Sequence, residues 1–284
     1  LSEALNQISG VSFTRNGGLG TTTNIFMRGS SNNRLLILID GVRTNDPSST
    51  NGSNIADIVM SNIERIEVIK GAQSGVWGSD AAAGVINIIT KENKTTAINI
   101  EYGAYNTRKA TLSTGTKIDR TSLSLNVQRL ETDGFSAQAP ADTDIDLYED
   151  DPYQNTNIIG KVKFDIDQDS SISLTHNYTD AQNSYDSFNA PDSTKRATSE
   201  TNLTSLEYQK NDTSILLQQS LFRSEQLDEG YTDIVKGQIQ QLQITHQLDN
   251  LLIGAELSEN KIHAEKPSYT YPAPTYSKTY TGQV

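Results

Sequence analysis

Residues Ile63–Lys91, which read IERIEVIKGAQSGVWGSDAAAGVINIITK, decide the fold of the first part of this chain. Two runs within it, Ile66–Ile69 and Val85–Thr90, are rich in Ile and Val, as expected of pleated and at least half-buried strands. Glycines at positions 71, 75, 78 and 84 favour sharp turns or a close backbone approach between these strands. Upstream, Arg34–Asp40 repeats the pattern of an apolar strand that ends in a glycine turn. With short helices over Leu1–Gln7 and Ile55–Met60, the pattern predicts a small α/β unit.

Composition limits the function classes. The chain has 284 residues, a hydrophobic content of 35% and a mean hydropathy of −0.52, and it contains no run of the roughly 18 apolar residues that a membrane-spanning helix needs. With 0 cysteines it has neither disulfides nor thiolate metal sites. The net charge is −12, and the stretch from Glu131 to Asp151 has eight acidic residues and no Lys or Arg. This excess of acid disfavours a nucleic-acid partner, and no arrangement of residues indicates an enzyme active site.

The pattern of the chain changes after Lys91. From Thr95 onward, apolar residues alternate with polar ones at period two, for example at Ile158, Val162 and Phe164. We expect about ten strands of roughly 8–12 residues, a length suited to strands that cross a membrane at a tilt. The expected domains are therefore residues 1–93 and residues 94–284.

The connections between these strands alternate in length. Short polar turns are expected at Ile118–Arg120, Asp167–Asp169, Lys210–Asp212 and Leu248–Asn250. Long connections are expected at Thr132–Gln154, Ala181–Thr198, Leu227–Asp233 and His263–Ser277. Short turns at one end and long loops at the other are typical of an outer-membrane β-barrel, whereas a soluble β-sandwich, the alternative, does not usually sort its loops in this way.

Five sequence pieces in the first segment carry a family resemblance. They are Leu5–Val11, Ile25–Gly29, Leu38–Val42, Ile63–Val68 and Gly84–Thr90. In this order and spacing they resemble the plug of a TonB-dependent outer-membrane receptor, over about a third of the chain. Within that family, the stretch from Thr14 through Gly41 is most similar to the cobalamin (vitamin B12) receptor.

The resemblance implies an α+β plug domain followed by antiparallel transmembrane β-barrel strands, about ten of an expected 22. It also implies active import across the outer membrane of a Gram-negative bacterium, with energy supplied by the partner TonB through a short N-terminal motif. We expect that motif, the TonB box, to be absent here, and the chain to be a fragment that holds the plug and the N-terminal part of the barrel.

The acidic segment offers a candidate calcium site. Its carboxylates supply many oxygen ligands within a short reach, as Ca²⁺ prefers, although a solvated acidic loop is the alternative. The resemblance implies that calcium orders the extracellular loops, with Glu149 and Asp151 as one acidic pair and Tyr185 with Asp186 as a second pair of ligands. Weaker candidates are Asp133, Asp144, Asp146 and Asp192.

Ligand contacts are expected on the plug apices. The resemblance points to five small polar residues: Thr22, Asn24, Ser31, Ser49 and Thr50. Such residues can bind the amide side chains of a corrin, but they are also ordinary loop residues. We further expect Arg28 to be buried and to bind Glu64 or Glu67, holding the plug together.

Three hypotheses for function follow from these patterns. The first is a transport receptor for a scarce nutrient, most similar to a cobalamin receptor. The second is a siderophore receptor, or a haem receptor that uses His263, on the same scaffold. The third belongs to another class: a ligand-binding signalling receptor or a surface adhesin.

Overall fold

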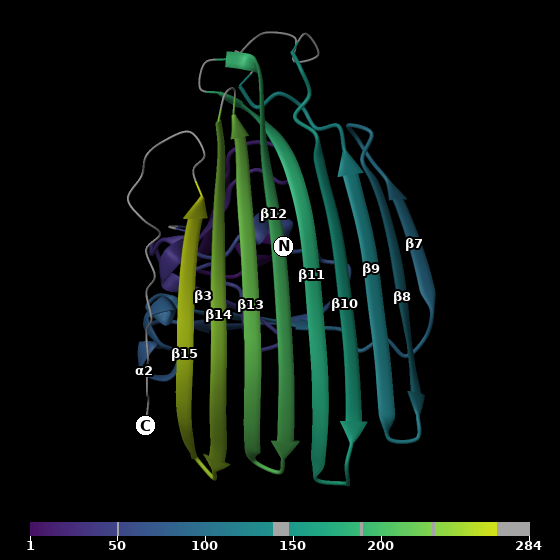
Figure 1. The fold of residues 1–284 in the computed structure, drawn as a ribbon, viewed down its shortest axis with the longest axis vertical. Helices are drawn as coiled ribbons and strands as arrows, with labels where there is room; N and C mark the ends of the chain where they lie inside the picture. The colour runs from purple at the N-terminus through teal and green to yellow at the C-terminus, as the bar shows by residue number, and fades with distance from the viewer. Residues whose placement is uncertain (50, 139–147, 188–189, 229–230, 266–284) are drawn as a thin grey trace.

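The computed structural model describes residues 1–49, 51–138, 148–187, 190–228 and 231–265 (Figure 1). The first segment is a small mixed domain, which we call the plug. Its helices are α1 (Ser2–Asn6) and α2 (Ser74–Trp77), with 3₁₀ turns at Asn32–Arg34, Ile55–Asp57 and Ser79–Ala81. Its strands are β1 (Val11–Arg15), β2 (Thr23–Met27), β3 (Leu35–Ile39), β4 (Val42–Arg43), β5 (Ile63–Lys70) and β6 (Gly84–Thr90).

The predicted pair of strands in Ile63–Lys91 is confirmed. Strands β5 and β6 pair antiparallel, β3 lies parallel to β6, and the four-stranded sheet has the order β4-β3-β6-β5. Gly84 has a φ of +154°, and a Cβ there would lie 2.4 Å from the carbonyl oxygen of Ile69. Only glycine allows this approach of the two strands. The predicted helix over Ile55–Met60 is instead a single 3₁₀ turn, Ile55–Asp57.

The second segment is one antiparallel sheet, which we call the wall. Nine described strands follow one another in the order β15 to β7, each paired with its neighbour in sequence. They are β7 (Ala97–Tyr102), β8 (Arg108–Ile118), β9 (Thr121–Thr132), β10 (Tyr153–Asp165), β11 (Ser170–Ser187), β12 (Ala190–Lys210), β13 (Thr213–Asp228), β14 (Tyr231–Leu248) and β15 (Leu251–Glu265). A tenth strand would fall outside the described residues.

The short turns are confirmed, but strands β10 to β15 are longer than predicted. Strands β11 and β12 have 18 and 21 residues, and they pair through most of the predicted loop 181–198. The predicted loop 227–233 is likewise largely paired strand. These ends are rich in polar residues, so they resemble loops in sequence, yet their backbone groups are paired across the ladder. The connection between β9 and β10 is long, as predicted.

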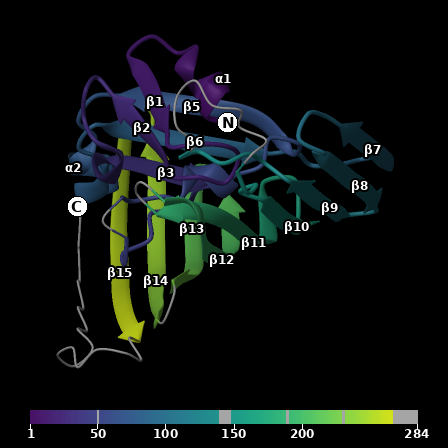
Figure 2. The same cartoon turned by 90° about the horizontal axis from the view of Figure 1, so that it is seen from above.

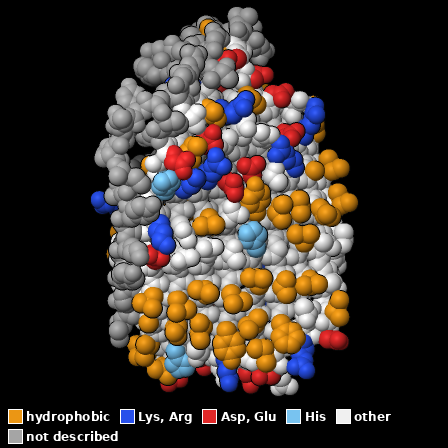
Figure 3. All heavy atoms as spheres, viewed as in Figure 1, with side chains coloured by type: hydrophobic (Ala, Val, Ile, Leu, Met, Phe, Trp, Pro, Cys, Tyr) orange, Lys and Arg blue, Asp and Glu red, His pale blue; other side chains and the backbone are white. Residues whose placement is uncertain are grey.

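The wall has two chemically different faces. Outward side chains such as Leu206 and Leu217 are 44% and 53% exposed, whereas the alternating positions Leu203 and Gln218 are 3% and 2% exposed. Apolar side chains gather in rows on the outward face (Figure 3). In the described part of the chain, no helix is long and apolar enough to cross a membrane.

The plug lies against the inward face of the wall, as the view from above shows (Figure 2). Its core is formed by buried residues of β3 and β6 together with residues of α1, β1 and β2, and three wall residues pack on it: Leu203, Phe222 and Ile239. Most other buried inward side chains of the wall are polar, among them Asn126, Asn157 and Gln241. The interface is therefore part apolar core and part hydrogen-bonded contact.

Candidate ligand-binding site

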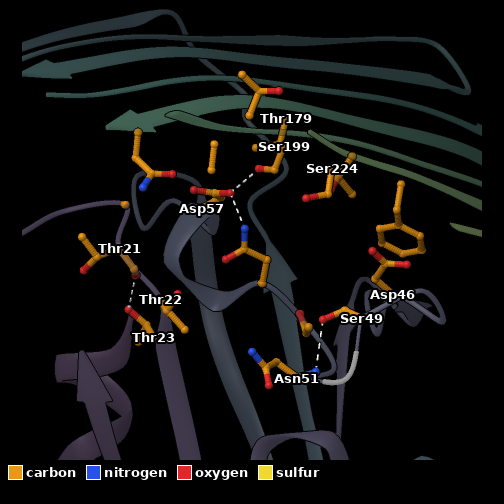
Figure 4. A pocket seen from close by; sticks show the side chains of 18 of the residues that line it. Thr21, Thr22, Thr23, Asp46, Ser49, Asn51, Asp57, Thr179, Ser199 and Ser224 are labelled. Carbon is orange, nitrogen blue, oxygen red and sulfur yellow. Dashed lines mark hydrogen bonds between the residues drawn. The ribbon is translucent and has the colours of Figure 1, made fainter. Parts of the chain in front are cut away.

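A cavity of about 710 Å³ lies between the plug loops and the inward face of the wall (Figure 4). On the plug side it is lined by residues 20–24, 46 and 48–54, excluding the undescribed position 50. On the wall side it is lined by β11, β12 and β13, and by Ala137 and Gln138 of the β9–β10 connection. Most of the lining side chains are Ser, Thr and Asn, so the cavity offers many hydrogen-bonding groups beside a few apolar residues such as Leu203 and Phe222.

The structure places three of the five predicted ligand-binding residues on this cavity: Thr22, Asn24 and Ser49. Ser31 does not line it; its hydroxyl donates to Asn33 Oδ1 over 2.7 Å on the exposed surface. Thr50 lies outside the described residues. The role of the three lining residues in binding stays a prediction.

Asp57, which the sequence patterns did not single out, joins the plug to the wall at the edge of the cavity. Its Oδ1 accepts a hydrogen bond of 2.9 Å from the hydroxyl of Tyr153 at the start of β10. Its Oδ2 accepts from the hydroxyl of Ser199 in β12 and from the amide of Asn54 (Figure 4). Burial raises the pKa of this carboxyl, and its hydrogen bonds oppose the rise. The sequence could have indicated this residue, because Asp57 is the single acidic residue in the otherwise apolar stretch Ile55–Val59.

Five acidic residues are among the described lining residues: Asp46, Asp57, Asp151, Asp186 and Glu200, which pairs with Arg223 across β12 and β13 and has its side chain on the same outward face. Burial also raises the pKa of Asp46, against the hydrogen bonds that it accepts from Ser48. Arg223 is the one basic residue among the described lining residues, and by strand alternation its side chain shares the outward face with Leu217 and Leu221. The electrostatic character of the described lining is therefore negative.

The β9–β10 connection packs against a glycine-rich plug loop. Phe135 lies 3.6 Å from where a Cβ of Gly18 would be, and Ala137 lies 2.8 Å from that of Gly17. Gly20 has a φ of +79°, and a Cβ there would lie 2.0 Å from the ring of Tyr153. Gly17, Gly18 and Gly20 therefore lie where the wall approaches the plug backbone closely.

Two of the predicted calcium ligands hold this same connection. Asp186 Oδ2 accepts from the Ser136 hydroxyl over 2.8 Å and from the backbone N–H of Gln138 over 3.3 Å. Asp151 Oδ2 accepts from the amide of Ala137 over 3.2 Å. Burial, and then the neighbouring charges of Asp186, Glu149 and Asp150, raise the pKa of Asp151 to about 6.

The remaining metal candidates are less well placed. Tyr185 lines the cavity and Glu149 is half-buried, whereas Asp133 is exposed. Asp144 and Asp146 fall outside the described residues, as does the side chain of Asp192. Within the part of the chain that the structure describes, no three His, Asp or Glu side chains converge as a metal site. One observation does fit a cation: Asp186 Oδ1 is buried and accepts no hydrogen bond from any described residue.

The prediction for Arg28 is wrong. Arg28 is exposed, and Glu64 and Glu67 both pair with Arg65. The buried plug arginine is Arg43, because β4 directs it toward the wall whereas the turn after β2 leaves Arg28 at the surface.

Arg43 and Asp40 anchor the plug away from the cavity. The Arg43 guanidinium donates to Gln241 Oε1 over 2.9 Å and to the Trp77 carbonyl over 2.7 Å, and it lies 3.3 Å from Glu256. Asp40 pairs with Lys161 of β10 at 3.1 Å. Both links join the plug sheet directly to wall strands.

Comparison with known proteins agrees with this architecture. Residues 1–85 match the family model described as TonB-dependent Receptor Plug Domain. A solved structure of the copper transporter OprC matches 99% of this chain with a TM-score of 0.75 and 16% identity. The ferric enterobactin receptor PfeA of Pseudomonas aeruginosa matches 93% with a TM-score of 0.68 and 19% identity. The siderophore receptor PiuA of Acinetobacter baumannii matches 99% with a TM-score of 0.65 and 15% identity.

The chain thus has the fold of these solved structures, in which residues 1–85 match the plug-domain family and an antiparallel sheet of barrel strands follows. The chain spans about half the length of the solved structures that it matches, at 46% of the copper transporter and 50% of PiuA.

Proposed function

We propose that this chain belongs to an outer-membrane receptor of a Gram-negative bacterium, which captures a scarce nutrient for TonB-dependent active uptake. The observation that carries the proposal is the polar cavity between the plug loops and the inward face of the wall. In that position a ligand contacts the plug and the barrel together, so a displacement of the plug by TonB would change both sets of contacts. The apolar outward rows of the wall suit a membrane environment.

The charge of the cavity favours a neutral or cationic ligand. Apart from Glu200 on the outward face, four carboxyl groups border the described part of it, and its other side chains are mainly hydroxyls and amides. An anionic iron chelate would be repelled by such a lining, whereas the amide-rich periphery of cobalamin could exchange hydrogen bonds with Thr22, Asn24 and Ser49. Cobalamin is therefore the first ligand that we propose.

A siderophore is the alternative ligand, and the printed names of two of the similar structures are those of siderophore receptors. In this case the chelate would carry little negative charge or would present amine groups to the carboxyls. A haem ligand has less support, because His263 pairs with Glu265 on the outward side of β15 and does not line the cavity.

We further propose that calcium binds at the β9–β10 connection, through Asp151 and Asp186 with Tyr185 and Glu149 nearby. Two observations support a hard cation here: the buried Oδ1 of Asp186 accepts no hydrogen bond from the described residues, and neighbouring acids contribute to the raised pKa of Asp151. A bound cation would strengthen the hold of these acids on the connection over the cavity.

Calorimetry of the intact receptor tests the ligand. Cyanocobalamin and a set of ferric siderophores of known charge would be titrated, each with calcium and with a chelator of calcium. Binding of a siderophore and not of cobalamin would support the alternative, a siderophore receptor. Binding of neither class, together with no TonB-dependent uptake in cells, would overturn the receptor proposal itself.

A matched pair of variants locates the site. Ser49→Tyr would place a phenol ring in the cavity and should weaken ligand binding strongly, because the ring occupies space that the ligand needs. Ser31→Tyr changes an exposed plug residue outside the cavity in the same way and should bind normally. Equal binding by both variants would place the ligand elsewhere.

A further inference from the structure

Asp46 begins the plug loop that lines the ligand cavity, shortly after β4. The residue before it fixes its position. Asn45 is buried, its side-chain amide donates to the Leu35 carbonyl over 2.9 Å, and its Oδ1 accepts from the backbone N–H of Ile37 over 2.9 Å. Both partners belong to β3, so the loop starts from a fixed point on the plug sheet and holds Asp46 at the cavity.

The two carboxylate oxygens of Asp46 have different surroundings. Oδ1 accepts from the backbone N–H of Ser48 over 2.8 Å and from its hydroxyl over 2.7 Å, which closes a turn within the loop. Oδ2 accepts no hydrogen bond from any residue that the structure describes, and it is not sealed from solvent as Asp186 Oδ1 is. Since Asp46 is half-buried and lines the cavity, this oxygen is an acceptor that a bound molecule can reach.

The other acids of the cavity have contacts that hold the protein together. Asp57 uses both carboxylate oxygens in hydrogen bonds that include wall residues, and Asp151 and Asp186 each hold the β9–β10 connection with Oδ2. Figure 4 shows Asp46 and Asp57 on different sides of the pocket. The hydrogen bonds of the Asp46 carboxylate stay within its own loop, so a role in ligand binding does not compete with a role in anchoring the plug.

The wall beside Asp46 presents a glycine and an aromatic ring. Gly237 of β14 approaches the loop so closely that a Cβ there would lie 2.2 Å from Asp46 Oδ1. Its cross-strand partner is Phe222 of β13, which also lines the cavity. Opposed positions in an antiparallel pair have Cβ atoms about 5 Å apart. The ring of Phe222 and the carboxylate of Asp46 therefore border the same part of the cavity.

A free carboxylate oxygen beside an aromatic ring suits a ligand nitrogen that carries hydrogens. A protonated amine or a primary amide can donate to the oxygen, and a positive charge is also attracted to the face of a ring. A hard cation such as Ca²⁺ takes about six to eight oxygens, whereas Asp46 offers one. Burial raises the pKa of Asp46, which disfavours its ionised form, and an N–H donor at Oδ2 would stabilise that form.

We propose that Asp46 is a specificity-determining residue of the cavity, and that its Oδ2 accepts a hydrogen bond from an amine or amide nitrogen of the ligand, with Phe222 against the adjoining carbon chain. This inference rests on the proposed function, because it concerns the same cavity. It narrows the ligand class to molecules that direct an N–H group at the plug loop. A ligand carboxylate or phenolate at this place would meet Asp46 with like charge.

Two pairs of ligands test the proposal by calorimetry on the intact wild-type receptor. The first pair is a linear ferric tris-hydroxamate with one terminal amine and the same chelate with a hydrogen in place of that amine. The second is cyanocobalamin and its derivatives with one side-chain amide at a time replaced by a methyl ester. In the pair that the receptor binds, loss of the N–H group should weaken binding about tenfold or more, because a hydrogen bond to a charged group is lost.

Asp46→Asn removes this recognition with little change in shape. The variant keeps an oxygen for Ser48 but places an NH₂ group where the free oxygen was. It should bind the N–H ligand about tenfold or more weakly than the wild type does and the partner without that group unchanged, so that the preference disappears. Asp133→Asn removes an exposed acid outside the cavity and should keep the wild-type preference.

The outcomes that contradict the proposal are distinct. If Asp46→Asn weakens both members of a pair equally, the loop has changed and no specific contact was lost. If the wild type binds both members equally, no N–H group is recognised. This second comparison needs no variant, so it decides the question when Asp46→Asn fails to fold, as judged by heat-dependent electrophoretic mobility.

Uptake by cells separates this inference from the proposed function. A receptor that supports TonB-dependent uptake but binds its ligand without any dependence on N–H groups contradicts only the role of Asp46. Binding of none of the four kinds of probe overturns the role of Asp46 as well. If uptake is also absent, the proposed function itself is contradicted.

Discussion

The hydroxyl of Tyr153 donates a hydrogen bond of 2.9 Å to Asp57 Oδ1, which joins the first residue of β10 to the last residue of a plug turn. Both side chains are buried, at 5% and 8% exposure. The same hydroxyl accepts from the amide of Asn155, whose side chain also donates to the Asp57 carbonyl. Together these contacts tie the plug turn at the edge of the ligand cavity to one wall strand.

Tyr153→Phe should weaken this contact. The variant keeps the ring but leaves a buried carboxylate with one donor fewer, which costs about 1–3 kcal/mol. The loss would be measured as a change in the free energy of unfolding by chemical denaturant. Cleavage of the plug by a protease would report the unfolded fraction. Tyr178→Phe, at an outward position of β11, serves as the control and should change little. Equal stability of the Tyr153 variant would mean that water replaces the hydroxyl at no cost.

Gly20→Ala should be strongly destabilising. The residue has a φ of +79°, which costs an L-amino acid about 1–2 kcal/mol, and the new Cβ would lie 2.0 Å from the Tyr153 ring. Relief of that overlap adds about 1–3 kcal/mol. Gly75→Ala in α2 is the matched control, since a Cβ there meets nothing within 4 Å. Similar thermal stability of the two variants would contradict the close approach of plug and wall.

Arg43→Gln tests the second link between plug and wall. The guanidinium is buried and lies 3.3 Å from Glu256, whose side chain is also largely buried, so its removal leaves a buried charge unpaired. Breaking such a pair costs about 3–5 kcal/mol. Arg65→Gln, which breaks exposed pairs with Glu64 and Glu67, should cost about 1 kcal/mol or less. A double variant with Glu256→Gln should recover part of the loss; if it is simply additive, the pair carries no coupling.

The sequence predicted the elements better than their contacts. The strands of Ile63–Lys91 and the short turns of the wall follow from local composition and period-two alternation, and both are confirmed. The paired ends of β11 and β12 were missed because their polar residues resemble a loop, although the ladder satisfies their backbone groups. Arg28 directly follows β2 and Arg43 is the last residue of β4, and only the packing of the wall decides which one is buried. The hydrogen bonds of Asp57 link residues 96 and 142 positions apart, so no local pattern could reveal them.

Asp151 should make the β9–β10 connection sensitive to pH. Burial, and then the charges of Asp186, Glu149 and Asp150, raise the pKa of Asp151 from 3.8 to about 6. A carboxyl with a higher pKa in the folded state binds its proton more tightly there. Its contribution to the stability of the connection is therefore complete below about pH 4 and is lost as the pH rises through about 6.

Hydrogen exchange at the amide of Ala137, which donates to Asp151, measures this effect. With a calcium chelator present and after correction for intrinsic exchange, protection should fall between about pH 4 and pH 7. Asp151→Asn is neutral at every pH and should remove most of that dependence, whereas Asp133→Asn, an exposed acid of the same connection, should keep it. If the Asp151 variant keeps the wild-type profile, another group titrates. If calcium abolishes the pH dependence of the wild type while the Asp151 variant does not respond to calcium, the same carboxylate is the one that the cation neutralises.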